Sequence, residues 1–194
     1  MDFDLTREQE MIRKEVRLFA EKEIAPVALE LDEEETFSSE LTRKMGEIGL
    51  FGMIVSEAYE GQQMDYIAYI IAVEEIARID GSQAATIAAG NSLGIGPLYY
   101  FGNEEQKQKY LPRIASGELR LQSMGVTEPT TGTDTTKIKT TAVRKGDRYV
   151  VNGQKVWISR VQHSDLMILL ARTTPLAEVK KKSHGMSIFI VDLK

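Results

Sequence analysis

The sequence has no cysteine, only two histidines and no long apolar run within its 194 residues. The absence of cysteine excludes disulfides, thiolate nucleophiles and cysteine-ligated zinc or iron–sulfur sites. With His163 and His184 alone, a multi-histidine metal centre or a Ser-His-Asp triad is nearly excluded, and no metal site is predicted. No apolar stretch approaches the roughly 20 residues that cross a bilayer, and the acidic start is unlike a secretory signal. These absences predict a cytoplasmic protein without a membrane span, or an organellar protein written without its transit segment.

Charge is unevenly distributed along the chain. Residues 1–135 hold 12 Lys or Arg and 25 Asp or Glu, whereas residues 136–194 hold 12 and 4. The overall net charge of −5 argues against nucleic-acid binding, which depends on basic side chains that neutralise phosphates. The basic second part would attract an anionic ligand, although a solvated charged sheet face is the more frequent explanation.

Helical patterns fill the first 118 residues. Thr6 and Gln9 form a capping-box pattern that opens a helix, which Pro26 is expected to disturb or end. Ser38 or Ser39 is predicted to cap a second helix. Asp65 begins a strongly apolar helix, predicted to be the central helix of a bundle because its apolar residues cover much of the circumference.

Strand patterns take over beyond Gly117. Short apolar or β-branched runs lie at residues 140–143, 149–151, 156–158, 166–171 and 187–191. Asn152-Gly153 predicts a type I′ hairpin between the second and third runs, and residues 145–147 predict the preceding turn. The sequence thus predicts an α+β multidomain fold: an all-helical domain over residues 1–118, then an antiparallel β-barrel-like domain over residues 119–194. We expect the second domain to be incomplete, because the chain stops directly after a strand-like run.

Two generic motifs fail on context. Gly94-Ile95-Gly96 begins like a dinucleotide-binding fingerprint, but Tyr99 occupies the third glycine position and no strand precedes it. Glu74 and Glu75 are adjacent on a helix and point about 100° apart, which is poor geometry for a shared acid–base function. A helix flank paired with Arg78 is the better interpretation of these two carboxylates.

The most unusual segment is residues 124–134, Met-Gly-Val-Thr-Glu-Pro-Thr-Thr-Gly-Thr-Asp. Glu-Pro followed by Thr-Thr-Gly-Thr-Asp predicts an extended strand that ends in a turn exposing hydroxyls and backbone amides. Such a loop suits a polar, phosphate-bearing ligand. Taken alone, however, it is more typical of a Ser/Thr-rich surface loop.

Three ordered motifs carry a family resemblance. Residues 127–134 match the pattern Thr-Glu-Pro-x-x-Gly-Ser-Asp, and residues 146–159 match Gly-Asp-x-Tyr-x-x-Asn-Gly-x-Lys-x-Trp-Ile-Thr. Residues 101–112, Phe-Gly-Asn-Glu-Glu-Gln-Lys-Gln-Lys-Tyr-Leu-Pro, match a helix at the end of the first domain. From Phe3 to Asp192 the chain resembles the acyl-CoA dehydrogenase family of flavoproteins.

The resemblance implies FAD-dependent α,β-dehydrogenation of an acyl-CoA thioester, as in fatty-acid β-oxidation. In that chemistry a glutamate base removes the α-proton while the β-hydride passes to N5 of FAD. Thr133 is implied to contact the pantetheine arm of CoA, and Ala89 and Leu93 to face the acyl tail. The residues implied to bind the flavin are Met124, Val126, Thr127, Thr133, Trp157, Ile158 and Ser159.

Each assignment has a structural alternative. Without the motif, Trp157 is more typical of a core position on a strand. The alternative for Thr133 and Ser159 is an edge hydroxyl bonded to backbone. Ala89 and Leu93 are as typical of an ordinary bundle core as of a pocket lining. Thr133 and Ser159 each exchange one hydroxyl residue for the other relative to the family pattern, which keeps the donor. Arg160 adds a charge where the family has Asn or Gly.

Length is the largest departure, because members of the family are about twice as long. The resemblance implies that a C-terminal four-helix bundle is absent here, together with the catalytic glutamate, much of the adenine contact and most of the subunit interface. No carboxylate of the chain matches the base, and Glu128 is a poor substitute because it belongs to the flavin-loop motif. We therefore expect no catalytic residue in this chain and little activity from it alone.

The implied partners are the acyl-CoA substrate, an electron-transfer flavoprotein as electron acceptor, and further copies in a dimer or tetramer when the protein is complete. Two alternatives stay open. The chain is a non-catalytic remnant that binds flavin, CoA or a partner, or it belongs to an acyl-CoA oxidase or flavin monooxygenase branch of the same fold.

Overall fold

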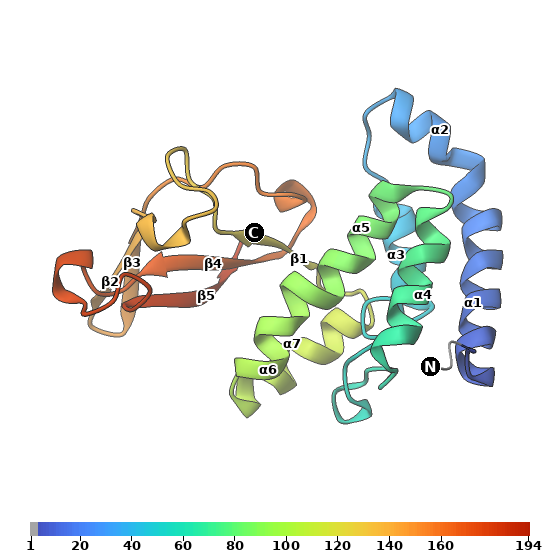
Figure 1. Ribbon diagram of the computed structural model, residues 1–194, viewed down its shortest axis with the longest axis horizontal. Coiled ribbons are helices and arrows are strands. Elements are labelled where there is room, and N and C mark those ends of the chain that lie inside the picture. The colour runs from blue at the N-terminus through green and yellow to red at the C-terminus, as the bar shows by residue number, and fades with distance from the viewer. Residues whose placement is uncertain (1–3) are drawn as a thin grey trace. The chain divides into compact units, whose positions relative to one another are not determined.

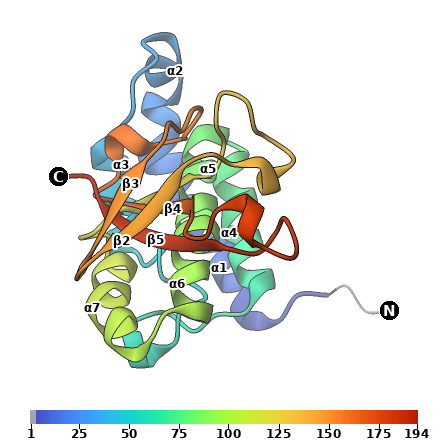
Figure 2. The same cartoon turned by 90° about the vertical axis from the view of Figure 1, so that its left-hand side faces the viewer.

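Two units make up the computed structural model, which describes residues 4–194, and the boundary between them follows Arg120. The helices of the first unit and the strands of the second are labelled in Figure 1 and seen from a second direction in Figure 2. Residues 1–3, with part of the acidic start and the first residue of the resemblance, lie outside the described residues.

The first helix, α1 (Arg7–Phe19), begins at the predicted capping box. The Thr6 hydroxyl accepts the Gln9 amide at 3.2 Å, and the Gln9 side chain accepts the Thr6 amide at 3.0 Å. The expectation that Pro26 disturbs or ends this helix is wrong, because the chain continues through a π-helical turn, η1 (Ala20–Ile24), into α2 (Ala25–Glu33). Pro26 lies in the first turn of α2, where a missing backbone N–H costs no helical hydrogen bond.

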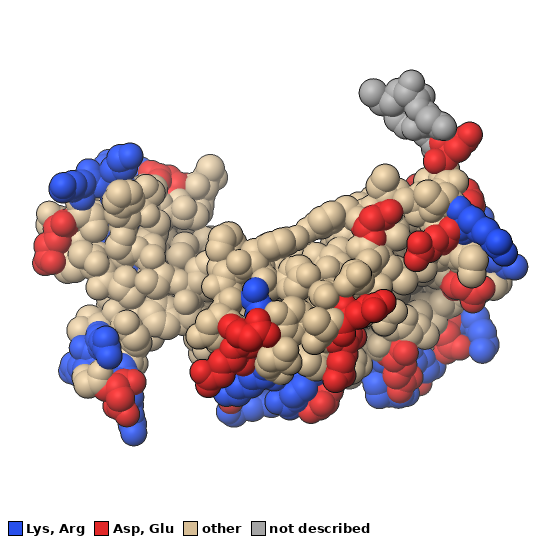
Figure 3. All heavy atoms as spheres, turned by 90° about the horizontal axis from the view of Figure 1, so that it is seen from below, with Lys and Arg blue, Asp and Glu red and all other residues tan. Residues whose placement is uncertain are grey.

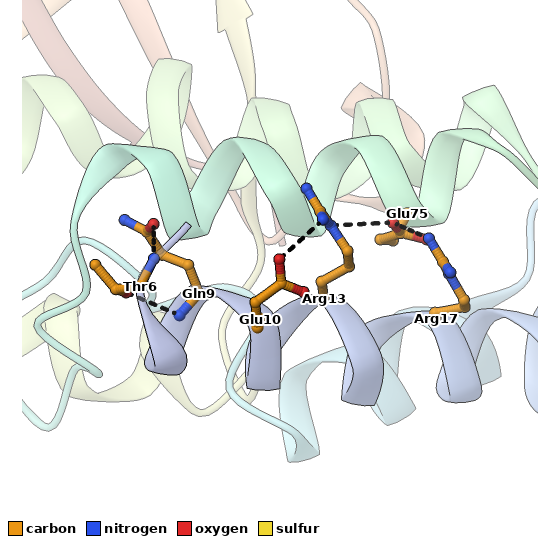
Figure 4. A network of polar contacts seen from close by, with 6 residues as sticks. All are labelled: Thr6, Gln9, Glu10, Arg13, Arg17 and Glu75. Atoms are coloured by element: carbon orange, nitrogen blue, oxygen red, sulfur yellow. Dashed lines mark hydrogen bonds and ion pairs between the residues drawn. The ribbon is translucent and has the colours of Figure 1, made fainter. Parts of the chain in front are cut away.

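Helices α1 and α4 (Tyr66–Ala77) run parallel and are joined by polar contacts at both ends. Near the N-termini of the two helices, the Gln9 side chain donates to Asp65 at 2.9 Å. Near their C-termini, Arg17 donates two hydrogen bonds to Glu75, each of 2.8 Å. Figure 4 shows the Arg17–Glu75 contact lying between the two helices. Arg78 also donates to Glu75 at 2.9 Å, which confirms the helix-flank interpretation of that carboxylate.

The Glu75 side chain is only 2% exposed, yet it stays charged. The hydrogen bonds from Arg17 lower the pKa of Glu75, and those from Arg78 add to the effect, against the opposing influence of burial. Arg13 approaches the same carboxylate at 3.9 Å and pairs with Glu10 on its own helix (Figure 4).

Two further helices of this unit begin at the predicted caps. Ser38 caps α3 (Ser39–Glu47) by accepting the Leu41 amide, and Asp65 caps α4 by accepting the Ala68 amide. The chain then forms α5 (Gly81–Ala89), the π-helical turn η3 (Gly90–Gly94), α6 (Ile95–Phe101) and α7 (Glu104–Ala115). The buried core of the unit consists of Val16, Ala20, Ile24, Leu41, Met45, Leu50, Phe51, Met53, Tyr69, Ala72, Ile76, Ala84 and Ile87.

Helix α4 is not surrounded on all sides, as a central bundle helix would be. Its buried face includes Ala72 and Ile76, whereas Tyr66, Ile67 and Ile70 are each 56% exposed within the described residues. The apolar circumference that suggested a central position is therefore covered on one face only.

Residues 121–194 form a mixed five-stranded sheet with β1 (Leu121–Gly125), β2 (Thr141–Lys145), β3 (Arg148–Asn152), β4 (Leu166–Arg172) and β5 (Met186–Asp192). The order is β1-β4-β2-β3, with β5 paired to β4. The α+β class is confirmed, but the expectation of an antiparallel sheet is wrong in part. The β1–β4 pair is parallel, as is the single β2–β4 contact, because long connections return the chain in the same direction.

The predicted Asn152-Gly153 hairpin does not form. Residues 153–158 are not a strand, and the hairpin lies one turn earlier, where Gly146 takes a φ of +65° between the antiparallel strands β2 and β3. Gly153 serves a close approach instead, since a Cβ there would lie 2.2 Å from the Thr140 hydroxyl and 2.7 Å from its Cα. The sheet pairing ends at Asn152, and the chain leaves the sheet at Gly153.

Acidic and basic side chains lie side by side on the face of the helical unit seen in Figure 3, so this face carries no patch of one sign. Within residues 4–194, no helix combines the length and the apolar character that a membrane crossing requires.

Candidate functional site

Two segments that the motifs singled out separately are adjacent in the sheet unit. Residues 124–127 end β1 and continue beyond it, and residues 155–159 follow the departure from β3. The Val156 amide donates to the Thr127 carbonyl oxygen at 3.0 Å, and Lys155 Nζ donates to the Val126 carbonyl oxygen at 2.9 Å. Motifs about 30 residues apart therefore share one local structure.

The side chains of these segments that the resemblance assigns to the flavin are accessible. Met124, Val126, Thr127 and Ile158 are half-buried, and Ser159 is exposed. Trp157 is 90% exposed, so the alternative of a core residue on a strand is wrong. A large aromatic side chain with so little cover is an unusual surface feature.

The backbone is strained at two positions close to Ser159. Trp157 has a φ of +59° and Arg160 a φ of +58°, in the left-handed region that side chains with a Cβ avoid. Such conformations cost on the order of 1–3 kcal/mol and gather at ligand-binding sites. The hydroxyl of Ser159 lies between the two strained residues.

The loop that carries Thr133 begins with a tight turn. Glu128 and Thr131 exchange backbone hydrogen bonds at 2.8 and 3.1 Å, and the Thr131 hydroxyl donates to the Lys137 carbonyl oxygen at 3.3 Å. Beyond the turn, Thr133 and Asp134 are exposed. Hydrogen bonds from Thr136 lower the pKa of Asp134, with a further contribution from Lys137. The loop thus presents the Thr133 hydroxyl at the surface from a fixed base.

Sequence reasoning missed a buried ion pair beneath these segments. Lys155 Nζ lies 3.0 Å from Oε1 of Glu128, and the two side chains are 8% and 4% exposed. Glu128 also accepts the backbone amides of Lys139 at 2.6 Å and Thr140 at 2.8 Å. The sequence offered only one signal for this pair: an acidic residue, Glu128, and a basic residue, Lys155, that each lie inside a motif assigned to ligand binding.

Glu128 is unsuited to act as a base. Burial by itself raises its pKa, but the donors of Thr140, Lys139 and Lys155 outweigh this effect and hold the pKa at about 2. A carboxylate with so low a pKa takes up a proton poorly near neutral pH. The hydrogen bonds and the low pKa therefore support the assignment of Glu128 to the loop rather than to proton transfer.

Ala89 and Leu93 belong to the helical unit, where Ala89 directly precedes the π-helical turn η3 and Leu93 lies within it. Ala89 is half-buried and Leu93 is 48% exposed, so the bundle-core alternative is wrong for Leu93. Between them the fully buried Asn91 donates to the carbonyl oxygens of Leu50 at 2.6 Å and Ile87 at 3.0 Å, and it accepts the Met53 amide at 3.1 Å. This side chain fixes the π-helical turn, a type of irregularity frequent at functional sites.

Two clefts of the helical unit lie away from these residues. A cleft of about 820 Å³ is lined by α2 (Leu29), by the segment that follows it (Phe37), and by the connection from α4 into α5 (Arg78). Another of about 350 Å³ lies along α1 and the segment after α3. Neither is lined by Ala89 or Leu93, so the predicted substrate contacts do not coincide with these clefts.

The residues of the sheet unit fit a flat aromatic ligand with a polar edge. Trp157 offers an uncovered aromatic face, and Thr127 and Ser159 offer hydroxyl donors on the two adjoining segments. Aromatic faces stack on planar rings, and hydroxyl donors stabilise negative charge at a ring edge.

Family models for the acyl-CoA dehydrogenase N-terminal domain and middle domain match residues 6–118 and 123–194. The chain belongs to the acyl-CoA dehydrogenase family. The resemblance carried by the three sequence motifs is thereby confirmed. Among curated relatives, the short-chain specific acyl-CoA dehydrogenase of Clostridium acetobutylicum is 43% identical over 192 residues, which are 99% of this chain and 49% of the relative.

Solved structures show the same fold. A chain from a structure of the electron transferring flavoprotein of Acidaminococcus fermentans matches with a TM-score of 0.93 and 42% identity, over 99% of this chain and 49% of that one. The acyl-CoA dehydrogenase of Bacillus anthracis, solved in complex with FAD, matches with a TM-score of 0.86 and 35% identity, over 97% and 32%. The chain spans about half the length of the curated relatives that it matches.

Proposed function

We propose that this chain is the N-terminal and middle portion of an FAD-dependent acyl-CoA dehydrogenase. Residues 1–118 would be its helical domain and residues 119–194 part of its middle domain, with the C-terminal helical bundle lying outside these 194 residues. One observation carries the proposal: the exposed, strained Trp157 lies beside residues 124–127, where hydroxyl and aromatic groups suit a flavin ring. The FAD complex of the Bacillus anthracis relative supports the choice of cofactor.

FAD, when bound, supplies the acceptor for the hydride that leaves the β-carbon of the acyl-CoA. The chain's own residues hold and polarise the ring. Met124, Val126 and Ile158 would contact it, Trp157 would pack beside it, and the hydroxyls of Thr127 and Ser159 would donate to its polar edge. Donors preorganised at that edge favour the transfer, because negative charge develops there.

The acyl-CoA substrate would be bound by Thr133 and by the pair Ala89 and Leu93. Thr133, exposed on its loop, would bond to the pantetheine arm of CoA, and would also lie near the flavin. Ala89 and Leu93 would line the acyl tail, which their partial exposure at the π-helical turn supports.

The catalytic base would come from outside this chain. The pKa of about 2 at Glu128 removes the carboxylate of the flavin loop from consideration. We therefore expect the chain to bind ligands and to dehydrogenate nothing by itself, with the glutamate supplied by the part that longer relatives possess.

We further propose an electron-transfer flavoprotein as the electron acceptor and a dimer or tetramer as the complete assembly. The match to a structure of the Acidaminococcus fermentans electron transferring flavoprotein supports the acceptor. The compartment would be the cytoplasm, or the mitochondrial matrix in a eukaryote, where acyl-CoA β-oxidation takes place.

Flavin retention tests the proposal. The purified chain is mixed with excess FAD, passed through a desalting column and examined for visible flavin absorbance, with and without butyryl-CoA. Retained flavin that butyryl-CoA fails to bleach is the expected result. A chain that emerges colourless would contradict the flavin site, and bleaching by the chain alone would contradict the external base.

A further inference from the structure

Lys155 links two segments through both parts of its side chain. Its aliphatic stem packs over Gly125, where an added Cβ would lie 3.5 Å from Lys155 Cγ. Its ammonium group donates to the Val126 carbonyl oxygen at 2.9 Å and to Glu128 at 3.0 Å. Together with the Val156–Thr127 hydrogen bond, these contacts fasten residues 125–128 to residues 155–156 at successive positions.

Glu128 connects the same point to the loop of Thr133. Its carboxylate accepts the amides of Lys139 and Thr140, the residues that lead into β2. Its backbone closes the tight turn with Thr131. One carboxylate therefore holds together the beginning and the end of the loop, as well as the Lys155 ammonium group.

A buried ion pair is a costly way to gain stability. Removing two charges from water offsets most of their attraction, and well-packed apolar side chains often serve stability as well or better. An ion pair with defined hydrogen-bond directions does fix register, which apolar contacts do less well. Residues 153–158 have no strand ladder of their own, so their register depends on such contacts.

We propose that Lys155 and Glu128 are positioning residues for the flavin ring. They fix residues 124–127 against residues 157–159, so that the hydroxyls of Thr127 and Ser159 present one continuous edge. This inference rests on the proposed flavin site and adds the pair that shapes it. Neither residue needs to touch the ligand for this role.

The test compares Lys155→Met with a control that destabilises the same unit by another route. Ala142→Gly removes a methyl group that is 1% exposed on strand β2, where Ala142 pairs with Val151 and with no residue of the two segments. FAD affinity is measured by flavin fluorescence at a temperature where circular dichroism shows every variant folded. We expect Lys155→Met to weaken affinity about tenfold or more, and Ala142→Gly to change it less than about twofold.

Amide hydrogen exchange supplies a second measurement that does not depend on flavin. In Lys155→Met the Val156 amide should exchange faster, while amides of the β4–β5 pair keep their protection. Glu128→Gln keeps an oxygen for the amides of Lys139 and Thr140 but loses the ion pair, so it should accelerate exchange at Val156 less than Lys155→Met does. If Lys155→Met does not fold, the Glu128→Gln variant still tests the positioning role.

The outcomes separate the two proposals. If the wild-type chain fails to bind FAD, the proposed function is wrong and this inference with it. If wild type binds FAD while Lys155→Met binds it equally well, or if exchange at Val156 is unchanged in both variants, only the positioning role is wrong.

Discussion

The Val156 amide donates to the Thr127 carbonyl oxygen at 3.0 Å, and this bond joins two motifs that are distant in sequence. Beside it stands Trp157, uncovered and held at a φ of +59°. Within the described residues Trp157 gains little packing, and this exposure is what motivates the proposed ligand site.

Trp157→Gly should separate stability from binding. Glycine adopts positive φ without strain, so the flavin-free variant should be about 1 kcal/mol more stable than wild type, or equally stable. Its retained flavin should fall. Urea unfolding and flavin absorbance measure the two effects, and Trp157→Phe, which keeps an aromatic ring, is the matched control. A less stable Trp157→Gly variant with normal flavin content would identify a structural tryptophan.

Asn91→Ala should damage the helical unit severely. The substitution leaves the Leu50 carbonyl oxygen and the Met53 amide without their partner in a fully buried position, at a cost of about 3 kcal/mol. The neighbouring Ser92→Ala removes one exposed hydroxyl bond to Ala88 and should cost less than about 0.5 kcal/mol. Equal losses of unfolding free energy in the two variants would contradict the anchoring role of Asn91.

Glu75→Gln should weaken the contact between α1 and α4. Arg17 and Arg78 would lose a buried charged partner, with an expected loss of about 2 kcal/mol, since the arginines themselves are half-exposed. Glu10→Gln on α1, whose side chain is 55% exposed and pairs with Arg13, should cost less than about 0.5 kcal/mol. Chemical denaturation of both variants checks the difference, and similar midpoints would show that Glu75 contributes little.

Glu128 should make stability depend on pH in the acid range. Its pKa falls from 4.5 to about 2 on folding, so its contribution is complete above about pH 4.5 and is lost as the pH drops towards 2. The stability difference between wild type and Glu128→Gln should therefore shrink over that interval. Comparing the two proteins removes the effect of other carboxylates, and a difference independent of pH would mean that Glu128 titrates normally.

The helix boundaries were predictable because their signals are local. The Thr6–Gln9 capping box and the Asp65 cap each satisfy free amides within one turn, so neighbouring residues suffice to locate them. The prediction that Pro26 ends the first helix was wrong because a π-helical turn precedes it and places Pro26 in the first turn of a new helix. No local sequence pattern predicts that turn.

The sheet was less predictable because its pairings are distant. Asn152-Gly153 has a strong hairpin signal, yet Gly153 packs closely against Thr140 instead of forming a turn. The residues that follow it bond to the segment after β1, through the Val156 amide and the Thr127 carbonyl oxygen. The motifs identified Trp157 and Ser159, but the pairing of Lys155 with Glu128 required the fold. Charged residues inside a ligand motif do not reveal whether they face the ligand or each other.

Trp157 is the only tryptophan of the chain, so its fluorescence reports on the proposed flavin site directly. Titration with FAD should quench this fluorescence to a plateau reached at one FAD per chain, by energy transfer to a ring packed beside the indole. Free N-acetyltryptophanamide, titrated identically, corrects for light absorbed by FAD itself. A decrease that follows this free indole at every FAD concentration, with no plateau, would contradict a flavin site at Trp157.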